Sequence, residues 1–490
     1  MNKPILNQSL SQRVVKGGFW VFSLRIIQRI FGIIRLIILA RILAPHDFGL
    51  LGIALLTLGT LETFSQTGFI AALIQKKDDI KDYLDSTWTV SILRGLILFT
   101  ILYLIAPYAA AFFDTTEAEP IIQVIGISIL LKAFTNIGII YFHKEMEFNK
   151  QFVYQLSGTL ADFIVTVSTA FILKSVWALV FGLLAGNFVR FIASYILHPY
   201  RPHLSSDTRK AKELFGFGKW IFGTSIITFI FNQGDDAFLG KVLGVTALGF
   251  YQMAYKIGQL PATEFAKMIS QITFPAYSKI QNDFSKLKKG FLKTLNITVF
   301  IMIPMTGGIF VLSDEFTRIF LTEKWMPMVP ALKILVVAGM IRALVTTGGA
   351  LFQGKGAPQI DFKMNLIRLL ILVVTIYPLT YFFKMSGVAL SVALGNFGCV
   401  PIWFAETAKI TKASPKDYLR VISPPFFVTI AVCIIILNLK LMIEVNTLVF
   451  ILMSSFAIVT YIVLVYLLEK VINIKMLAEL KYVIRIIRGK

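Results

Sequence analysis

About fourteen long apolar runs constrain the fold of this 490-residue chain more than any other feature of its sequence. An α-helix needs roughly 20 apolar residues to cross a bilayer, and each run is about that long. Apolar residues make up 56% of the chain and charged residues 15%, unlike the composition of a soluble protein. The sequence therefore predicts an all-α, polytopic integral membrane protein with no large soluble domain. The predicted spans are residues 17–40, 48–74, 86–113, 120–142, 151–173, 175–197, 216–240, 247–275, 294–313, 331–352, 364–383, 386–407, 422–439 and 447–468.

Basic residues indicate the orientation. The net charge is +21, which in a soluble protein would suggest nucleic acid, but in a membrane protein the excess marks the cytoplasmic loops. If the N-terminus is cytoplasmic, the loops on its side and both tails hold about 29 Lys and Arg, against about 7 in the opposite loops. We therefore expect both termini in the cytoplasm, with the N-terminal segment acting as an uncleaved signal anchor.

A repeat at an offset of 200 residues predicts two related halves. Residues 18–49 align without a gap with residues 218–249, pairing Trp20 with Trp220 and Gly49 with Gly249. Six predicted spans separate the copies, so both enter the membrane in the same direction, as in transporters with parallel repeats. We predict two pseudo-symmetric six-helix lobes and two extra helices with a basic tail. The predicted domains are residues 1–200, 201–410 and 411–490.

Basic residues inside the predicted spans outnumber acidic ones by more than two to one. A charge at the bilayer centre costs at least about 2.5 to 3.5 kcal/mol, so such residues normally face a cavity or a partner. The bases are Arg25, Arg29, Arg35, Arg94, Lys132, Arg190, Lys219, Lys256, Lys267, Lys333, Arg342 and Arg368. The acids at depth are Glu62, Asp162, Asp235, Asp236 and Glu264. Internal pairing cannot neutralise this set.

The first helix carries a polar stripe. At about 100° per residue, Arg25, Arg29 and Arg35 fall with Gln28 and Gly32 within an arc of roughly 120°. Arg25 and Arg35 could instead reach the two membrane interfaces. Arg29 lies deeper, and its alternative is a structural ion pair with Glu62 on the next helix.

The acidic residues suggest coupling and gating. Asp235 occupies the repeat position of Arg35, so a contact between the two could form a gate, although Asp235 and Asp236 could also be hydrated at a helix end. Glu62 and Asp162 could take up a coupling proton, since burial raises a carboxylate pKa. A static hydrogen bond to Ser or Thr neighbours is the alternative for each.

An arginine-rich cavity suits an anionic ligand, because the guanidinium fork matches phosphate oxygens. A phosphate-bearing lipid could cross with its head between the lobes and its tail in the bilayer. The predicted diphosphate-binding residues are Arg25, Arg29, Arg35, Arg94, Lys132 and Arg342, and the predicted coupling or gating residues are Glu62, Asp162, Asp235 and Asp236.

Signatures of enzymes are missing from the sequence. No Gly-rich phosphate loop is present, and no extramembrane loop is long enough to hold a transferase site. The histidines form neither a metal pair nor a base beside a serine nucleophile. We therefore expect no metal, no cofactor and no enzymatic activity. The four histidines are His46, His143, His198 and His203.

Several motifs resemble the polysaccharide transporter family, and within it the Wzx and colanic-acid-type flippases. The resemblance lies in residues 39–50 (LARILAPHDFGL), 68–75 (GFIAALIQ), 243–251 (LGVTALGFY), 259–261 (QLP) and 274–278 (FPAYS). It covers about residues 10–410 and is weak for the last two helices.

This resemblance implies the multidrug/oligosaccharidyl-lipid/polysaccharide (MOP) exporter fold and a function. It implies ion-gradient-coupled transfer of an oligosaccharide linked to undecaprenyl diphosphate across the bacterial inner membrane, for O-antigen, capsule or exopolysaccharide synthesis. Partners would be the bilayer and a polymerase and glycosyltransferases, with the flippase acting as a monomer. The rivals are a cation-coupled multidrug antiporter, a peptidoglycan-precursor flippase and a membrane glycosyltransferase or polymerase.

Overall fold

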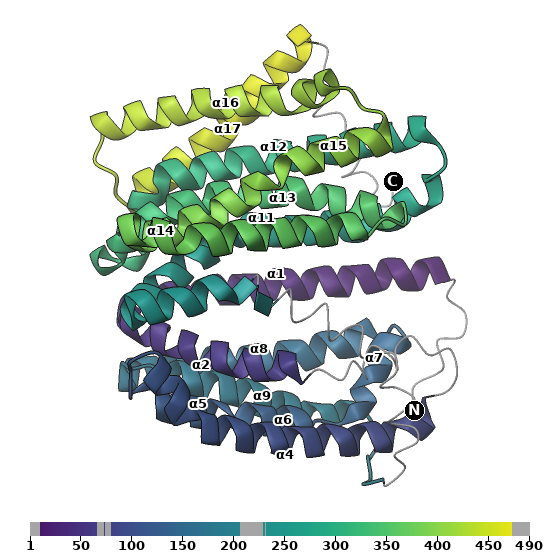
Figure 1. The fold of residues 1–490 in the computed structure, drawn as a ribbon, viewed down its shortest axis with the longest axis vertical. Helices are drawn as coiled ribbons and strands as arrows, with labels where there is room; N and C mark the ends of the chain where they lie inside the picture. The colour runs from purple at the N-terminus through teal and green to yellow at the C-terminus, as the bar shows by residue number, and fades with distance from the viewer. Residues whose placement is uncertain (1–9, 66–72, 74–79, 206–228, 231, 473–490) are drawn as a thin grey trace. The chain divides into compact units, whose positions relative to one another are not determined.

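The described part of the chain is helical throughout. The computed structural model describes residues 10–65, 73, 80–205, 229–230 and 232–472, and every regular element in these ranges is a helix (Figure 1). Within them, nine helices are long and apolar enough to cross a membrane, and a pair of helices bent by 71° adds a tenth. The predicted polytopic all-α fold is confirmed. The helices form two compact units, Met1–Gly249 and Phe250–Lys490.

The first unit begins with a helix of 33 residues, which is long enough to cross a bilayer but is not one of those nine apolar helices. A broken span, Ala118–Lys144, stands where the sequence predicts one continuous span, because the Asn136 side chain accepts a hydrogen bond from Gly138 N and caps a new helix start. The helices are α1 (Leu10–Ile42), α2 (Pro45–Phe64), α4 (Lys81–Phe112), α5 (Ala118–Ile125), α6 (Ile127–Ala133), η1 (Ile137–Ile139), α7 (Ile140–Lys144), α8 (Phe148–Leu173) and α9 (Trp177–Leu197). Residues 232–243 are also helical, whereas most of the predicted span 216–240 lies outside the described residues.

The second unit contains the longer helices. They are α11 (Val245–Ile280, whose first turn belongs to the first unit), α12 (Phe284–Phe316), η2 (Thr317–Leu321), η3 (Glu323–Met328), α13 (Val329–Gly354), α14 (Gln359–Gly398), α15 (Val400–Thr411), α16 (Pro415–Met442) and α17 (Thr447–Ile472). Non-helical angles at Lys384 (φ 51°, ψ −132°) divide α14, as expected for the separate predicted spans 364–383 and 386–407.

Aromatic residues form the core of the second unit. Phe291 of α12, Trp403 of α15 and Tyr418 of α16 are buried with ring centroids 5.8 to 6.2 Å apart. The last helix joins this unit through Tyr461, whose hydroxyl donates to Phe300 O at 3.0 Å. The two C-terminal helices α16 and α17 therefore pack on α12 rather than standing apart.

Glycines bring α8 and α9 into close contact. A Cβ atom at Gly182 would overlap Thr166 Oγ1, and one at Gly186 would lie 2.9 Å from Gly158 O and 3.0 Å from Asp162 Cβ. Small residues allow this approach between membrane helices, where packing replaces the hydrophobic effect as the main stabilising term. The two helices thus form a tight hairpin, with Asp162 and Thr166 in the interface.

The two copies of the sequence repeat touch each other inside the first unit. A Cβ atom at Gly49 of α2 would overlap Val245 O at the start of α11, and one at Gly249 would overlap Pro45 O. Residues 45 and 49 correspond to residues 245 and 249 at the repeat offset. The backbones of α2 and α11 therefore cross in a symmetric contact that only glycine permits at both positions.

Candidate functional site

Polar residues of α1 lie against polar residues of α8. The two helices run parallel, with Trp20 packed on Phe152 and Phe31 on Phe163, both pairs of ring centroids 5.0 Å apart. Between these aromatic pairs, Gln28 Nε2 donates to Thr159 Oγ1 at 3.1 Å. The predicted polar stripe of the first helix thus faces protein at this level.

Arg35 forms an ion pair with Asp162 of α8. The second carboxylate oxygen of Asp162 accepts a hydrogen bond from Thr166 Oγ1 at 3.1 Å. The side chains of Arg35 and Asp162 are 34% and 24% exposed, so the pair is partly shielded from solvent. Arg35 therefore contacts an acid of α8, and its predicted gate contact with Asp235 stays a prediction.

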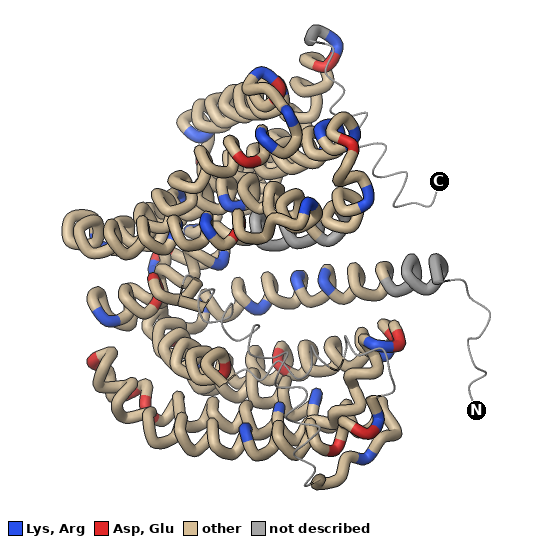
Figure 2. The backbone as a smooth tube through the Cα atoms, turned by 45° about the vertical axis from the view of Figure 1, so that its right-hand side comes forward, with Lys and Arg blue, Asp and Glu red and all other residues tan. Residues whose placement is uncertain are grey.

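Arg25 and Arg29 have positive charges that no residue of the described helices pairs with. Both side chains are half-buried, and neither forms a hydrogen bond or an ion pair with another residue of the described ranges. Figure 2 shows basic positions recurring along α1. Glu62, the alternative partner of Arg29, is bound by Lys132 instead. These two arginines are the members of the predicted set that remain available to a ligand.

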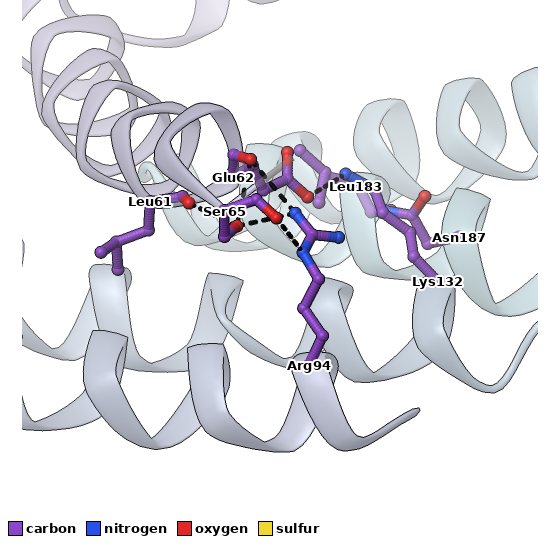
Figure 3. A network of polar contacts seen from close by, with 7 residues as sticks. All are labelled: Leu61, Glu62, Ser65, Arg94, Lys132, Leu183 and Asn187. Atoms are coloured by element: carbon purple, nitrogen blue, oxygen red, sulfur yellow. Dashed lines mark hydrogen bonds and ion pairs between the residues drawn. The ribbon is translucent and has the colours of Figure 1, made fainter. Parts of the chain in front are cut away.

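A second polar network joins α2, α4 and α6 (Figure 3). Lys132 Nζ lies 2.9 Å from Glu62 Oε1, with the Lys132 side chain 51% exposed. Arg94 does not bind the Glu62 carboxylate but turns to the end of α2. Its Nε donates to Ser65 O at 2.8 Å, and one Nη donates to Ser65 Oγ at 2.7 Å and Glu62 O at 3.1 Å.

These contacts make Arg94 a cap for the C-terminus of α2. The last carbonyls of a helix have no partner within the helix, and they carry the negative end of its dipole. Ser65 Oγ also donates to Leu61 O at 2.7 Å, so the two side chains together bind the Leu61 and Glu62 carbonyls of the final turn. The donors of Arg94, which were predicted to bind a diphosphate, are engaged by Ser65 and by the Glu62 carbonyl.

The remaining predicted residues lie elsewhere. Asp235 is 3% exposed, so the alternative of a carboxylate hydrated at a helix end is wrong for this residue. Asp236 follows it in the same helical stretch, and both acids have interaction partners. In the second unit, Arg342 donates from Nη1 to Tyr255 OH at 3.0 Å. Lys219 and the side chains of Lys267 and Glu264 lie outside the described residues.

A set of hydrogen bonds that the sequence does not predict anchors the segment after α9. Asp85 Oδ1 accepts hydrogen bonds from Tyr200 OH at 2.7 Å and His203 N at 2.8 Å. Asn136 Nδ2 donates to Tyr200 O at 2.6 Å. Burial and the Asp85 contact raise the pKa of Tyr200. No local pattern signals this anchor, because its partners are more than 60 residues apart in the chain.

His198 belongs to the same region. Its ring stacks on Tyr141 with centroids 5.5 Å apart, and its Nδ1 accepts a hydrogen bond from Tyr200 N at 3.2 Å. Burial, followed by the nearby charge of Lys150, holds the pKa of His198 below its usual value. The neutral imidazole is therefore the form that fits this structure.

Comparison with known proteins identifies the family. A family model described as "Polysaccharide biosynthesis protein" matches residues 38–330, more than half of the chain. The chain belongs to the polysaccharide biosynthesis protein family. Among curated relatives of this family member, "Lipopolysaccharide biosynthesis protein WzxC" of Escherichia coli (strain K12) is 26% identical over 435 residues, which cover 87% of each chain. "Teichuronic acid biosynthesis protein TuaB" of Bacillus subtilis (strain 168) is 24% identical, with 77% of this chain and 78% of the relative covered.

Solved structures establish the fold of this polysaccharide biosynthesis protein. "Lipid II flippase MurJ, inward closed conformation" matches with a TM-score of 0.75 at 17% identity, over 93% of this chain and 100% of that one. A multidrug resistance MATE family transporter of the MOP superfamily, in its inward-facing conformation, matches with a TM-score of 0.63 at 16% identity, over 79% of this chain and 96% of that one. The resemblance to the polysaccharide transporter family and the MOP-like membrane fold are both confirmed.

Proposed function

We propose that this protein is a flippase for an oligosaccharide linked to undecaprenyl diphosphate. It carries the lipid-linked unit from the cytoplasmic to the outer leaflet of the inner membrane by alternating access, with both of its own termini in the cytoplasm. Glycosyltransferases build the unit before this step and a polymerase consumes it afterwards. The family and the biosynthetic roles printed in the names of WzxC and TuaB support the proposal.

The observation that carries the proposal is that Arg25 and Arg29 have no hydrogen-bond or ion-pair partner among the described residues. An arginine inside a membrane span costs several kcal/mol unless it has a partner. Both arginines lie in the predicted span 17–40, and neither has a partner among the described residues. Both lie on the same face of α1. A diphosphate supplies at least two negative charges and several acceptor oxygens, which matches two neighbouring guanidinium groups.

Arg35 and Lys132 would join the site by exchanging partners. Asp162 holds Arg35, and Glu62 holds Lys132, through carboxylates that a diphosphate can replace. A carboxylate that loses its counter-charge gains affinity for a proton. Glu62 and Asp162 thus couple headgroup binding to proton uptake, while Asp235 and Asp236 serve the gate.

The charge balance also weighs against a multidrug antiporter. A cationic drug needs acidic residues along its path, whereas the spans of this chain carry an excess of arginine and lysine. The likeness to MurJ concerns the fold, so a peptidoglycan-precursor substrate gains no support from it.

The test is Arg29→Ala in cells that depend on this protein for polysaccharide export. We expect export to stop and the lipid-linked oligosaccharide to accumulate, with an unchanged amount of protein in the membrane. The matched control is Arg420→Ala, which removes an exposed arginine of α16 and should leave export intact. Normal export by Arg29→Ala at wild-type protein levels would contradict the proposed site.

A further inference from the structure

Arg190 of α9 is a transmembrane cation that the proposed site leaves unused. It forms no hydrogen bond and no ion pair with another residue of the described ranges. Its Nε is fully buried without an acceptor, whereas its two Nη atoms are not among the buried atoms. The side chain as a whole is half-buried. The end of the guanidinium group is therefore open while its stem is enclosed.

Gly158 of α8 holds this side chain in place. A Cβ atom at Gly158 would overlap Cγ and Nε of Arg190 and would lie 2.8 Å from its Cζ. The arginine stem thus lies flat on the α8 backbone at a position that is open only because residue 158 is glycine. The neighbouring contact of Gly186 with Gly158 O brings α9 close enough for this arrangement.

This conformation differs from that of an arginine that reaches for lipid headgroups. A snorkelling arginine extends along its own helix toward the membrane surface. Arg190 instead turns across to the neighbouring helix and buries its Nε there. Such a placement leaves a desolvated donor without a partner, which is unfavourable for any donor and more so for a charged group. A cost of this kind is offset when a ligand supplies the missing charge.

The register of the helices places Arg190 at the depth of the α1 arginines. Gln28 of α1 bonds to Thr159, the residue after Gly158, so Gln28 from α1 and Arg190 from α9 contact α8 at the same level. Arg25 and Arg29 are within three residues of Gln28, or about 5 Å along the axis at 1.5 Å per residue. All four residues belong to the first compact unit.

We propose that Arg190 is a further substrate-binding residue, which contributes a third guanidinium group to the diphosphate headgroup of the lipid. This inference rests on the proposed flippase function. The two Nη atoms make an end-on, bidentate contact with phosphate oxygens, while Gly158 fixes the stem on α8. Arg190 recognises the second phosphate group, because Arg25 and Arg29 together are enough to bind the first phosphate group.

The experiment measures the affinity of purified protein in detergent for undecaprenyl diphosphate and for undecaprenyl monophosphate. We expect Arg190→Gln to weaken binding of the diphosphate about tenfold and of the monophosphate much less. Arg190→Lys keeps the positive charge but lacks the two-pronged guanidinium group, so its affinity for the diphosphate should lie between those of Arg190→Gln and wild type. Arg420→Gln, the same substitution at an exposed site on α16, should leave both affinities unchanged.

Gly158→Ala separates a binding role from a packing role. The added methyl group pushes Arg190 off α8 but keeps the charge, so it should also weaken diphosphate binding relative to monophosphate. If Arg190 were only a packing residue, Arg190→Gln and Gly158→Ala would lower the unfolding temperature and leave the ratio of the two affinities unchanged. That unchanged ratio would overturn the inference.

Binding measurements distinguish a wrong flippase function from a wrong role for Arg190. If the wild-type protein binds neither lipid phosphate, the proposed flippase function itself is wrong. If Arg29→Ala loses diphosphate binding while Arg190→Gln retains it, the flippase function stands and only the role of Arg190 is wrong.

Discussion

Replacing Arg94 by alanine should destabilise the protein rather than remove a substrate contact. The guanidinium group makes three hydrogen bonds to the last turn of α2, to Ser65 O, Ser65 Oγ and Glu62 O. A hydrogen bond to a charged group contributes about 1.5 to 3 kcal/mol, and a cation at a helix C-terminus contributes up to about 2 kcal/mol. The three bonds share one side chain and are not additive, so we expect a loss of about 2 to 4 kcal/mol.

The control lies in the same network (Figure 3). Lys132 binds Glu62 through a side-chain ion pair, and its own side chain is 51% exposed. Exposed pairs contribute about 0 to 1 kcal/mol, so Lys132→Ala should change stability little. Arg94→Lys should lie between the two, because an ammonium group cannot span the carbonyls of Glu62 and Ser65 together.

The assay is unfolding of the purified variants in detergent, followed by undecaprenyl diphosphate binding measured on the folded fraction. We expect Arg94→Ala to unfold at a lower temperature than Lys132→Ala and to bind the lipid normally once folded. If Arg94→Ala unfolds like the wild type and fails to bind, the capping argument is refuted and Arg94 belongs to the headgroup site.

Two further predictions concern the repeat contact and the segment after α9. Gly49→Ala forces a methyl group onto Val245 O and should lower the free energy of unfolding by about 1 to 3 kcal/mol. The control is Gly308→Ala, where nothing lies within 4 Å, and it should be neutral or slightly stabilising. Equal effects of the two substitutions would contradict the contact. The lowered pKa of His198 means that the folded state favours the neutral ring. Its contribution to stability is present above the unfolded pKa of about 6.5 and is lost as pH falls below it. Hydrogen exchange of residues 198–205 should therefore accelerate as pH falls below about 6.5, and in His198→Gln this pH step should be absent.

Hydropathy predicts the membrane-spanning segments because the bilayer requires each one to satisfy its backbone internally. The breaks within segments are harder to predict. The predicted span at 120–142 is interrupted at Asn136, whose side chain caps Gly138 N and donates to Tyr200 O. Its backbone N–H donates to Ser194 Oγ. Ser194 and Tyr200 come about 60 positions later in the chain, so a local window of sequence cannot reveal these two bonds.

In the candidate site, too, the features that depend on nearby residues are predictable and those that depend on distant residues are not. Helical periodicity predicts Arg25, Arg29 and Arg35 on one stripe of α1, since that depends only on the turn per residue of a helix. The partner of each charge depends on which helix lies opposite and at what register. Arg35 met Asp162 through the parallel packing of α1 on α8. No charge count along the chain contains that information, so the ligand-accessible subset of the predicted residues emerged only from the structure.

The symmetric contact between α2 and α11 gives the internal repeat a physical reason. Gly49 meets Val245 while Gly249 meets Pro45, so each copy of the motif presents the same backbone surface to the other. This is the arrangement of an isologous interface, in which equivalent positions contact each other around a twofold axis. A side chain at either glycine would separate the backbones at both crossing points, because the two contacts lie one helical turn apart. Both copies of the repeat therefore require glycine at this position. The sequence match between the copies includes these contact residues, Gly49 and Gly249.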